Sequence, residues 1–112
     1  MPNQVIEFAP FHLTTGMTEA DLRAGSTRLH DKVLKSLPGF VRRQLVRHGD
    51  GAYADIVCWE SKAQSDQAMS SIGATEAGKA YFALMDFEKE HAPRKAGTME
   101  FFEVLGTYER GV

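Results

Sequence analysis

The sequence has little of the features that would define its class directly. Its 112 residues include one cysteine, four prolines and one tryptophan, and the 13 basic residues nearly balance the 15 acidic ones. A single cysteine excludes an internal disulfide and a cysteine-based zinc site, which favours a reducing compartment, so we expect a cytoplasmic protein. A formal net charge of −2 creates no positive field, and we therefore expect no nucleic-acid partner.

Several longer signals are missing too. No apolar run approaches the roughly 20 residues of a membrane-spanning helix, and residues 1–4 do not resemble a signal peptide, so we expect no membrane partner. The glycines form no dinucleotide-binding or phosphate-binding loop, and no two histidines have the spacing of a metal site. We therefore expect neither a metal nor another cofactor, and a single domain over residues 1–112.

Alternating and helical patterns predict one order of elements. We expect strands over residues 4–13, 40–48, 53–60 and 98–108, a helix over 18–37, and a second helical segment over 61–88 that is broken at Gly73. This β-α-β-β-α-β order is typical of the ferredoxin-like fold, an α+β architecture with a four-stranded antiparallel sheet. Since crossover connections are right-handed, both helices are expected on one face of that sheet.

Local signals support this order. Thr18 stands three residues before Asp21, and Ser61 stands three residues before Gln64, which is the spacing of helix-capping boxes. Gly-Asp-Gly at residues 49–51 lies between two β-rich runs and predicts a hairpin. The boundaries of both helical segments and of the central hairpin therefore follow from turn and cap chemistry.

Alternation separates the two faces of the sheet. We expect the cleaner apolar set to face the helices, and it consists of Ile6, Phe8, Ile56, Cys58, Phe102 and Val104. The opposite face would then display Phe11, Tyr53, Val57, Trp59, Phe101 and Leu105. Because a patch with four aromatic rings is too apolar to stay in water, we expect the same face of a second copy to cover it, which forms a homodimeric barrel.

Several short stretches resemble one known superfamily. They are Leu-Pro-Gly-Phe at 37–40, Asp50-Gly51, Val57-Cys58-Trp59-Glu60-Ser61 followed by Ala63 and Ala68, and then Phe82, Met85 and Asp86. On these residues the chain resembles the dimeric α+β barrel superfamily, and within it the antibiotic-biosynthesis-monooxygenase-like domains. The resemblance implies the fold expected above and, as the leading activity, a monooxygenase-like reaction without metal or flavin.

In such a reaction an electron-rich substrate, for example an aromatic enolate, reacts with oxygen itself. The protein contributes deprotonation, desolvation and positioning of that substrate. Relatives in the superfamily also degrade haem, but this chain has no histidine between His48 and His91 that could serve as a ligand on the second helix. Haem binding is therefore not expected.

Two side chains are candidates for the base. Asp55 lies by parity on the aromatic face, where a carboxylate needs a partner, and Arg42 and Arg43 on the neighbouring strand are candidates for that partner. His12 is expected at the helix-side rim of the first strand, where a pocket opens. Each has a purely structural alternative, which is an ion pair for Asp55 and a solvated or capped imidazole for His12.

Other side chains are candidates for substrate contacts. They are Trp59, Tyr81 and Phe82 as cavity lining, with His30 and Arg42 as further contacts. Core or dimer packing explains Trp59 equally well, and His30 has a solvated alternative. Glu7 and Glu103 share the parity of Asp55, so they either line a polar cavity with it or pair with arginines.

Two functions from different classes fit these features. The first is an enzyme, a cofactor-independent monooxygenase-like protein that acts on a small apolar or aromatic molecule. The second is a non-catalytic dimer that binds a small hydrophobic ligand or serves as a stress or accessory module. RNA recognition is rejected, because Asp55 stands on the third strand where an RNA-recognition module would place a stacking ring.

Overall fold

The computed structural model describes residues 3–49, 51–87, 90–91, 94–95 and 99–111. Its elements are β1 (Val5–Leu13), α1 (Glu19–Lys32), a short 3-10 helix (Leu34–Ser36), β2 (Phe40–Arg47), β3 (Ala52–Trp59), α2 (Lys62–Ala74), α3 (Glu76–Phe82), β4 (Met85–Asp86), β5 (Glu90–His91), β6 (Arg94–Lys95) and β7 (Glu100–Glu103). Within these residues the main sheet has five strands in the order β2-β3-β1-β4, with β7 also pairing with β1. Every pairing in it is antiparallel.

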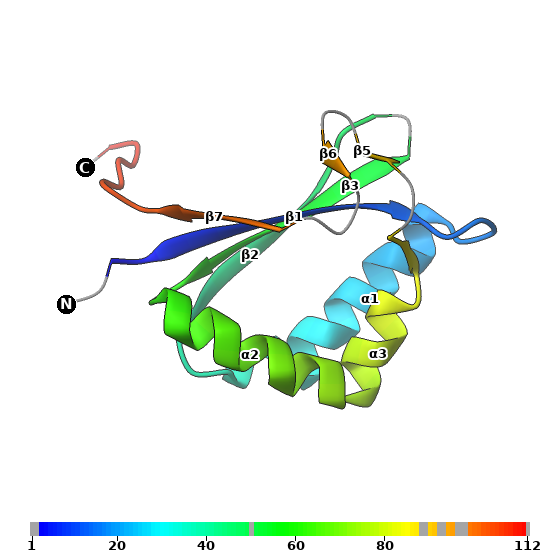
Figure 1. Ribbon diagram of the computed structural model, residues 1–112, viewed down its shortest axis with the longest axis horizontal. Coiled ribbons are helices and arrows are strands. Elements are labelled where there is room, and N and C mark those ends of the chain that lie inside the picture. Colours follow the sequence, from blue (N-terminus) through cyan, green and yellow to red (C-terminus); the bar gives the residue numbers. More distant parts are fainter. Residues whose placement is uncertain (1–2, 50, 88–89, 92–93, 96–98, 112) are drawn as a thin grey trace.

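The α+β, ferredoxin-like architecture is confirmed, with α1, α2 and α3 on one side of the sheet (Figure 1). The first helix begins as its sequence predicts, because Thr18 and Asp21 form a reciprocal capping box. Ser61 likewise caps α2 by accepting a hydrogen bond from the backbone N–H of Gln64. Local capping chemistry thus sets where each helix starts, and packing on the sheet decides its length.

The break in the second helical segment lies two residues later than expected. Helix α2 continues through Gly73 to Ala74, and Thr75 then caps α3 by accepting a hydrogen bond from Gly78 N at 3.0 Å. A side chain at Gly78 would place its Cβ 1.9 Å from the carbonyl oxygen of Ile72. Glycine is therefore required where α3 turns back against the end of α2.

The end of the chain also differs from expectation. Helix α3 stops at Phe82, and Met85–Asp86 form the short strand β4 beside the end of β1. The last strand is only four residues long, and of the expected range 98–108 residue 98 lies outside the described residues. Beyond β7 the tail leaves the sheet, so Leu105 and Tyr108 are 90% and 94% exposed. No other strand pairs with this tail within the described residues. The prediction from apolar content alone therefore gave a last strand that was too long.

The assignment of the two sheet faces was wrong. The set with Phe11, Tyr53, Val57 and Trp59 packs beneath the helices, where Trp59 is only 1% exposed, and joins the core with Leu29, Ile72 and Tyr81. Ile6, Phe8 and Ile56 lie on the open face and are half-buried, and Phe102 is 49% exposed. Alternation separates two faces without saying which one is covered, and here the larger rings fill the space between sheet and helices.

This exchange brings polar residues under the helices. Glu7 and Asp55 have the same parity as Trp59, so both carboxyls come to lie between the sheet and the helical layer, where they are 6% and 8% exposed. Buried carboxyls need hydrogen-bond partners, and the helices supply them. In the described part of the chain, no helix is long and apolar enough to cross a membrane.

Candidate functional site

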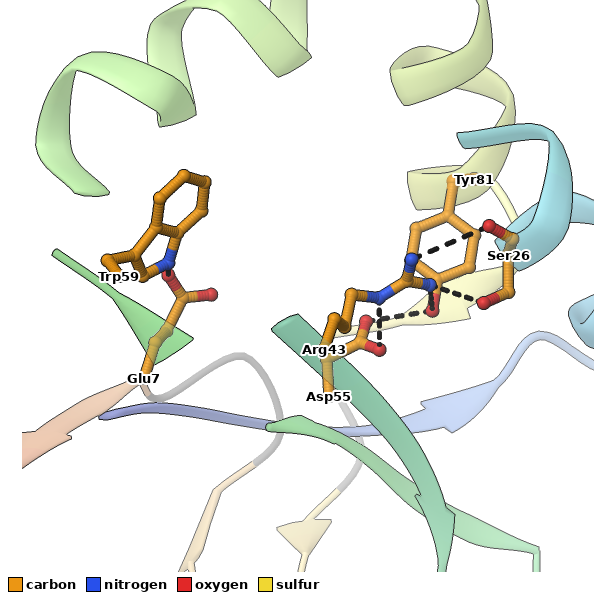
Figure 2. Close-up of polar contacts among 6 residues, drawn as sticks. All are labelled: Glu7, Ser26, Arg43, Asp55, Trp59 and Tyr81. Carbon is orange, nitrogen blue, oxygen red and sulfur yellow. Dashed lines mark hydrogen bonds and ion pairs between the residues drawn. The ribbon is translucent and has the colours of Figure 1, made fainter. Parts of the chain in front are cut away.

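A cavity of about 390 Å³ lies between the covered face of the sheet and the helices. Its volume is within the range of small-molecule sites. The described residues that line it are mostly apolar: Glu7, Ala9, Pro10, Phe11, Leu29, Leu34, Arg43, Asp55, Val57, Trp59, Met69, Ile72, Tyr81, Phe82, Met85, Phe87 and Met99. The polar groups among them form two clusters, one around each carboxyl (Figure 2).

The first cluster, the Glu7 cluster, consists of Glu7 on β1, Trp59 on β3 and Ser65 on α2. The indole Nε1 of Trp59 donates a hydrogen bond of 3.1 Å to Oε1 of Glu7, and the Ser65 hydroxyl donates one of 3.2 Å to the same oxygen. Among the described residues no donor bonds to the second oxygen, Oε2. Figure 2 shows the second oxygen turned away from Trp59 toward the side of the cavity that holds Arg43.

The environment of Glu7 raises the pKa of its carboxyl above the ordinary value for a glutamate. Burial raises the pKa of Glu7, and the hydrogen bonds from Ser65 and Trp59 offset only part of that rise. The negative charge of Asp55 raises the pKa further, while Lys62 lowers it slightly. Glu7 lies opposite Val57 in the register, so Glu7 and Asp55 are diagonal neighbours on adjacent strands, roughly 7–8 Å apart.

The second cluster, the Asp55 network, consists of Asp55, Arg43 on β2, Tyr81 on α3 and Ser26 on α1. Arg43 Nε donates to Oδ1 of Asp55 at 2.9 Å, and the Tyr81 hydroxyl donates to Oδ2 at 2.7 Å. The remaining nitrogens of Arg43 donate to the Ser26 hydroxyl, to the Ser26 carbonyl oxygen and to Tyr81 Oη. These contacts tie β2, β3, α1 and α3 together, as Figure 2 shows.

The Asp55 network holds its charges as a compensated pair. The side chains of Arg43 and Asp55 are only 7% and 11% exposed, so water contributes little, and each side chain is the main counter-ion of the other. Burial and then the adjacent Asp55 carboxylate raise the pKa of Tyr81 well above its usual range. Tyr81 is therefore a neutral hydroxyl that donates to Asp55, and both oxygens of Asp55 are engaged.

The structure places four of the seven candidate residues on the cavity: Asp55, Trp59, Tyr81 and Phe82. Three others lie elsewhere. His12 has the parity of Ile6 and Phe8, so the exchange of faces moves it out of the cavity to a surface depression beside Gly16. His30 and Arg42 line a separate groove between α1 and β2, where the His30 ring lies 5.9 Å from that of Phe40.

Sequence reasoning named Arg42 and Arg43 together as partners for Asp55, and the structure assigns that contact to Arg43. A bulge between Phe40 and Arg42 shifts the β2 register, and Arg42 points to the open face as the register partner of Cys58. Glu7 was named only as a residue of the same parity as Asp55. No sequence signal marked Ser26 or Ser65, because their roles depend on how each helix is rotated against the sheet.

Among the residues that the structure describes, no group of three His, Cys, Asp or Glu side chains is arranged to hold a metal ion. The polar groups of the cavity are the two carboxyls and the side chains bonded to them. One carboxyl, Asp55, has both oxygens engaged by Arg43 and Tyr81, and the other, Glu7, has one anchored oxygen and one oxygen open to the cavity.

Comparison with known proteins finds its matches among solved structures. No family model and no curated protein matches the sequence. SnoaB, a cofactor-independent oxygenase from Streptomyces nogalater, superposes with a TM-score of 0.70 at 20% identity, over 94% of this chain and 96% of that one. A protein from Caulobacter crescentus named after the antibiotic biosynthesis monooxygenases gives a TM-score of 0.63 at 21% identity, over 94% and 92% of the two chains.

A haem-degrading protein from Mycobacterium tuberculosis also shares this arrangement, with a TM-score of 0.60 at 18% identity over 95% of this chain and 99% of that one. Proteins with different activities thus share the fold at low identity, and a fold shared in this way does not transfer an activity. The likeness does establish the architecture. The chain has the ferredoxin-like α+β fold of the antibiotic-biosynthesis-monooxygenase-like proteins.

Proposed function

We propose that this protein is a monooxygenase-like enzyme that acts on a small apolar or aromatic substrate without metal or flavin, with Glu7 as the base. One observation carries the proposal. Glu7 is buried in the cavity wall, its Oε1 is anchored by Trp59 and Ser65, and its Oε2 faces the cavity without a donor among the described residues. A general base needs this combination of fixed orientation and an accessible lone pair.

The sequence indicates Asp55 as a candidate base, but in this proposal it is a positioning residue. Both of its oxygens accept hydrogen bonds, from Arg43 and from Tyr81, so it has little capacity to receive a substrate proton. We assign it to positioning the Tyr81 side chain and to keeping a negative charge near Glu7, which makes Glu7 more basic. His12 has no part, because it does not line the cavity.

For this reaction the protein supplies proton removal, exclusion of water and positioning of the substrate. Glu7 takes a proton from an acidic O–H or C–H of the substrate, and the resulting anion transfers electrons to molecular oxygen. Oxidation of a substrate methylene to a carbonyl by one oxygen molecule, with the second oxygen atom leaving as water, balances without an added reductant. The apolar wall excludes bulk water from the anion and holds the ring in place.

The test is oxygen consumption with a panel of phenols and enolisable aromatic ketones, in buffer that contains a metal chelator. Glu7→Gln keeps the shape and the acceptor for Trp59 but cannot accept a proton, and we expect it to lower kcat by about 100-fold or more. Glu60→Gln, at an exposed position next to Trp59, is the matched control and should leave the rate unchanged. Undiminished turnover by Glu7→Gln would rule out Glu7 as the base.

One observation also favours a second function, the non-catalytic binding of a small hydrophobic molecule. All polar groups of the Asp55 network bond to one another, so among the described lining residues only Glu7 offers the ligand an open polar atom. A binding protein needs no more than that. Saturable binding of panel members, with no oxygen consumption by any of them, would favour this second function over the first.

We further propose that the protein works as a homodimer, although the supporting surface differs from the one expected from sequence. The open sheet face carries Ile6, Phe8 and Ile56, and next to it lies a tail whose Leu105 and Tyr108 are almost fully exposed. Burial of these side chains by a second copy removes apolar surface from water. Native mass spectrometry tests this, and an Ile56→Glu variant should shift a dimer to monomer.

A further inference from the structure

Among the described residues that line the cavity, one carboxyl has no counter-charge. Arg43 and Asp55 neutralise each other through a 2.9 Å ion pair, so that pair presents no net charge to a ligand. Glu7, 6% exposed, receives hydrogen bonds from two described donors, Trp59 and Ser65, and both are neutral. When Glu7 is ionised, the described residues that line the cavity therefore carry one uncompensated negative charge.

Lys62 is the described basic side chain whose charge acts on Glu7, and it is directed elsewhere. Lys62, on the first turn of α2, forms an ion pair with Asp66 in which its Nζ lies 2.5 Å from the carboxylate, and the same Nζ lies 4.2 Å from the centre of the Phe101 ring. Its side chain is 49% exposed, so water screens its effect on Glu7. Among the described residues no cation neutralises Glu7, so a ligand that brings its own positive charge gains an ion pair there.

The rest of the wall suits such a cation. Trp59, Phe11, Tyr81 and Phe82 line the same cavity, and aromatic faces attract ammonium groups through their quadrupoles. The apolar wall also removes water from the bound charge, which strengthens its attraction to a carboxylate. An anionic ligand, in contrast, would be repelled by the Glu7 carboxylate.

We infer that this cavity binds small lipophilic primary amines as ammonium ions, with the nitrogen on Oε2 of Glu7 and the hydrocarbon part against the aromatic wall. The inference rests on the same cavity as the proposed function and adds a ligand class to it. An amine on Oε2 occupies the lone pair that a substrate proton would need. Lipophilic amines are thus expected to compete with an oxygenase substrate at this site.

The test compares two probes that differ in one group, 2-phenylethylamine and 2-phenylethanol, in isothermal titrations at neutral pH and constant ionic strength. We expect the amine to bind about tenfold more tightly or better, because hydrogen bonds to charged groups are the stronger class. In Glu7→Gln this preference should disappear while the alcohol still binds. Glu60→Gln, which changes an exposed carboxylate outside the cavity, should retain the preference.

A cavity-filling variant tests whether the two probes bind in this cavity. Met69 lines the cavity from α2, and Met69→Trp should abolish binding of both probes if they occupy this space. Equal affinities of amine and alcohol in the unmodified protein, no binding of either probe, or an amine preference that survives in Glu7→Gln would each overturn the inference.

The outcomes also separate the inference from the proposed function. An amine preference that depends on Glu7, without oxygen consumption on any panel substrate, supports the ligand class and removes the oxygenase. Oxygen consumption that depends on Glu7, without an amine preference, supports the oxygenase and overturns the ligand class.

Discussion

The indole N–H of Trp59 donates to Glu7 Oε1 across 3.1 Å, which connects the protein's one tryptophan to a carboxyl whose other oxygen is open to the cavity. Protonation of Glu7 changes the acceptor that the indole faces. We therefore expect the fluorescence of Trp59 to titrate with an apparent pKa above 4.5, the ordinary value for a glutamate. A fluorescence pH titration measures this, and the step should be missing in Glu7→Gln.

Ser65 tunes the same titration. Its hydroxyl is fully buried and donates to Glu7 Oε1, and this hydrogen bond lowers the pKa of Glu7 against the larger effect of burial. Ser65→Ala should therefore move the Trp59 fluorescence step to higher pH. Ser70→Ala, at an exposed position on the same helix, is the control and should leave the step where it was. An unmoved step in Ser65→Ala would contradict the hydrogen bond.

The raised pKa of Glu7 also predicts how stability depends on pH. Between pH 4.5 and the folded-state pKa, the folded protein binds more protons at Glu7 than the unfolded chain does, so this group's contribution falls as pH rises through that window. Glu19 acts with the opposite sign at lower pH, because the hydrogen bond from Arg47 lowers its pKa. Urea unfolding of the wild type and Glu7→Gln across this range isolates Glu7 by difference, and parallel curves would contradict the assignment.

The Asp55–Arg43 pair is a stability element as well as a part of the cavity. Asp55→Ala leaves the Arg43 guanidinium buried without its counter-charge, and we expect this to lower the free energy of unfolding by about 3–5 kcal/mol. Asp66→Ala removes an exposed pair with Lys62 and should cost about 0.5 kcal/mol or less. Chemical denaturation compares the two variants, and similar costs would show that the Asp55 pair is not buried in solution.

Two glycines in neighbouring helices should respond oppositely to the same substitution. At Gly78 an added Cβ would lie 1.9 Å from the Ile72 carbonyl oxygen, so Gly78→Ala should lower the free energy of unfolding by about 1–3 kcal/mol. At Gly73 nothing lies within 4 Å of an added Cβ. Gly73→Ala should therefore stabilise α2 by about 0.5–1 kcal/mol. Thermal unfolding distinguishes the two signs.

The order of elements could be predicted because its signals are local. The Thr18–Asp21 capping box and the glycine-rich turn at 49–51 act within a few residues, and both occur at the expected places in the structure, apart from residue 50, which lies outside the described residues. Strand β4 was not predicted, because its two residues, Met85 and Asp86, are too short a segment to show alternation. Their strand geometry depends on pairing with Leu13 and His12, which no local pattern records.

The site was only partly predictable for a different reason. Asp55, Trp59 and Glu7 share one parity on the sheet, and that much can be read from alternation. Which face the helices cover depends on the size of the rings relative to the space beneath α2 and α3, and this is a property of the packed molecule. Ser65 and Ser26 join the two clusters only through the rotation of their helices, so no spacing in the sequence marks them.

The joint between α2 and α3 has a consequence for ligand selectivity. Ser65, which holds Glu7, lies on α2, and Tyr81, which holds Asp55, lies on α3, so the angle between these two helices sets the span between the two ends of the cavity. Thr75 and Gly78 determine that angle although neither lines the cavity. Substitutions at this joint would adjust the length of ligand that fits, which makes it a means of changing ligand preference without altering any residue that a ligand touches.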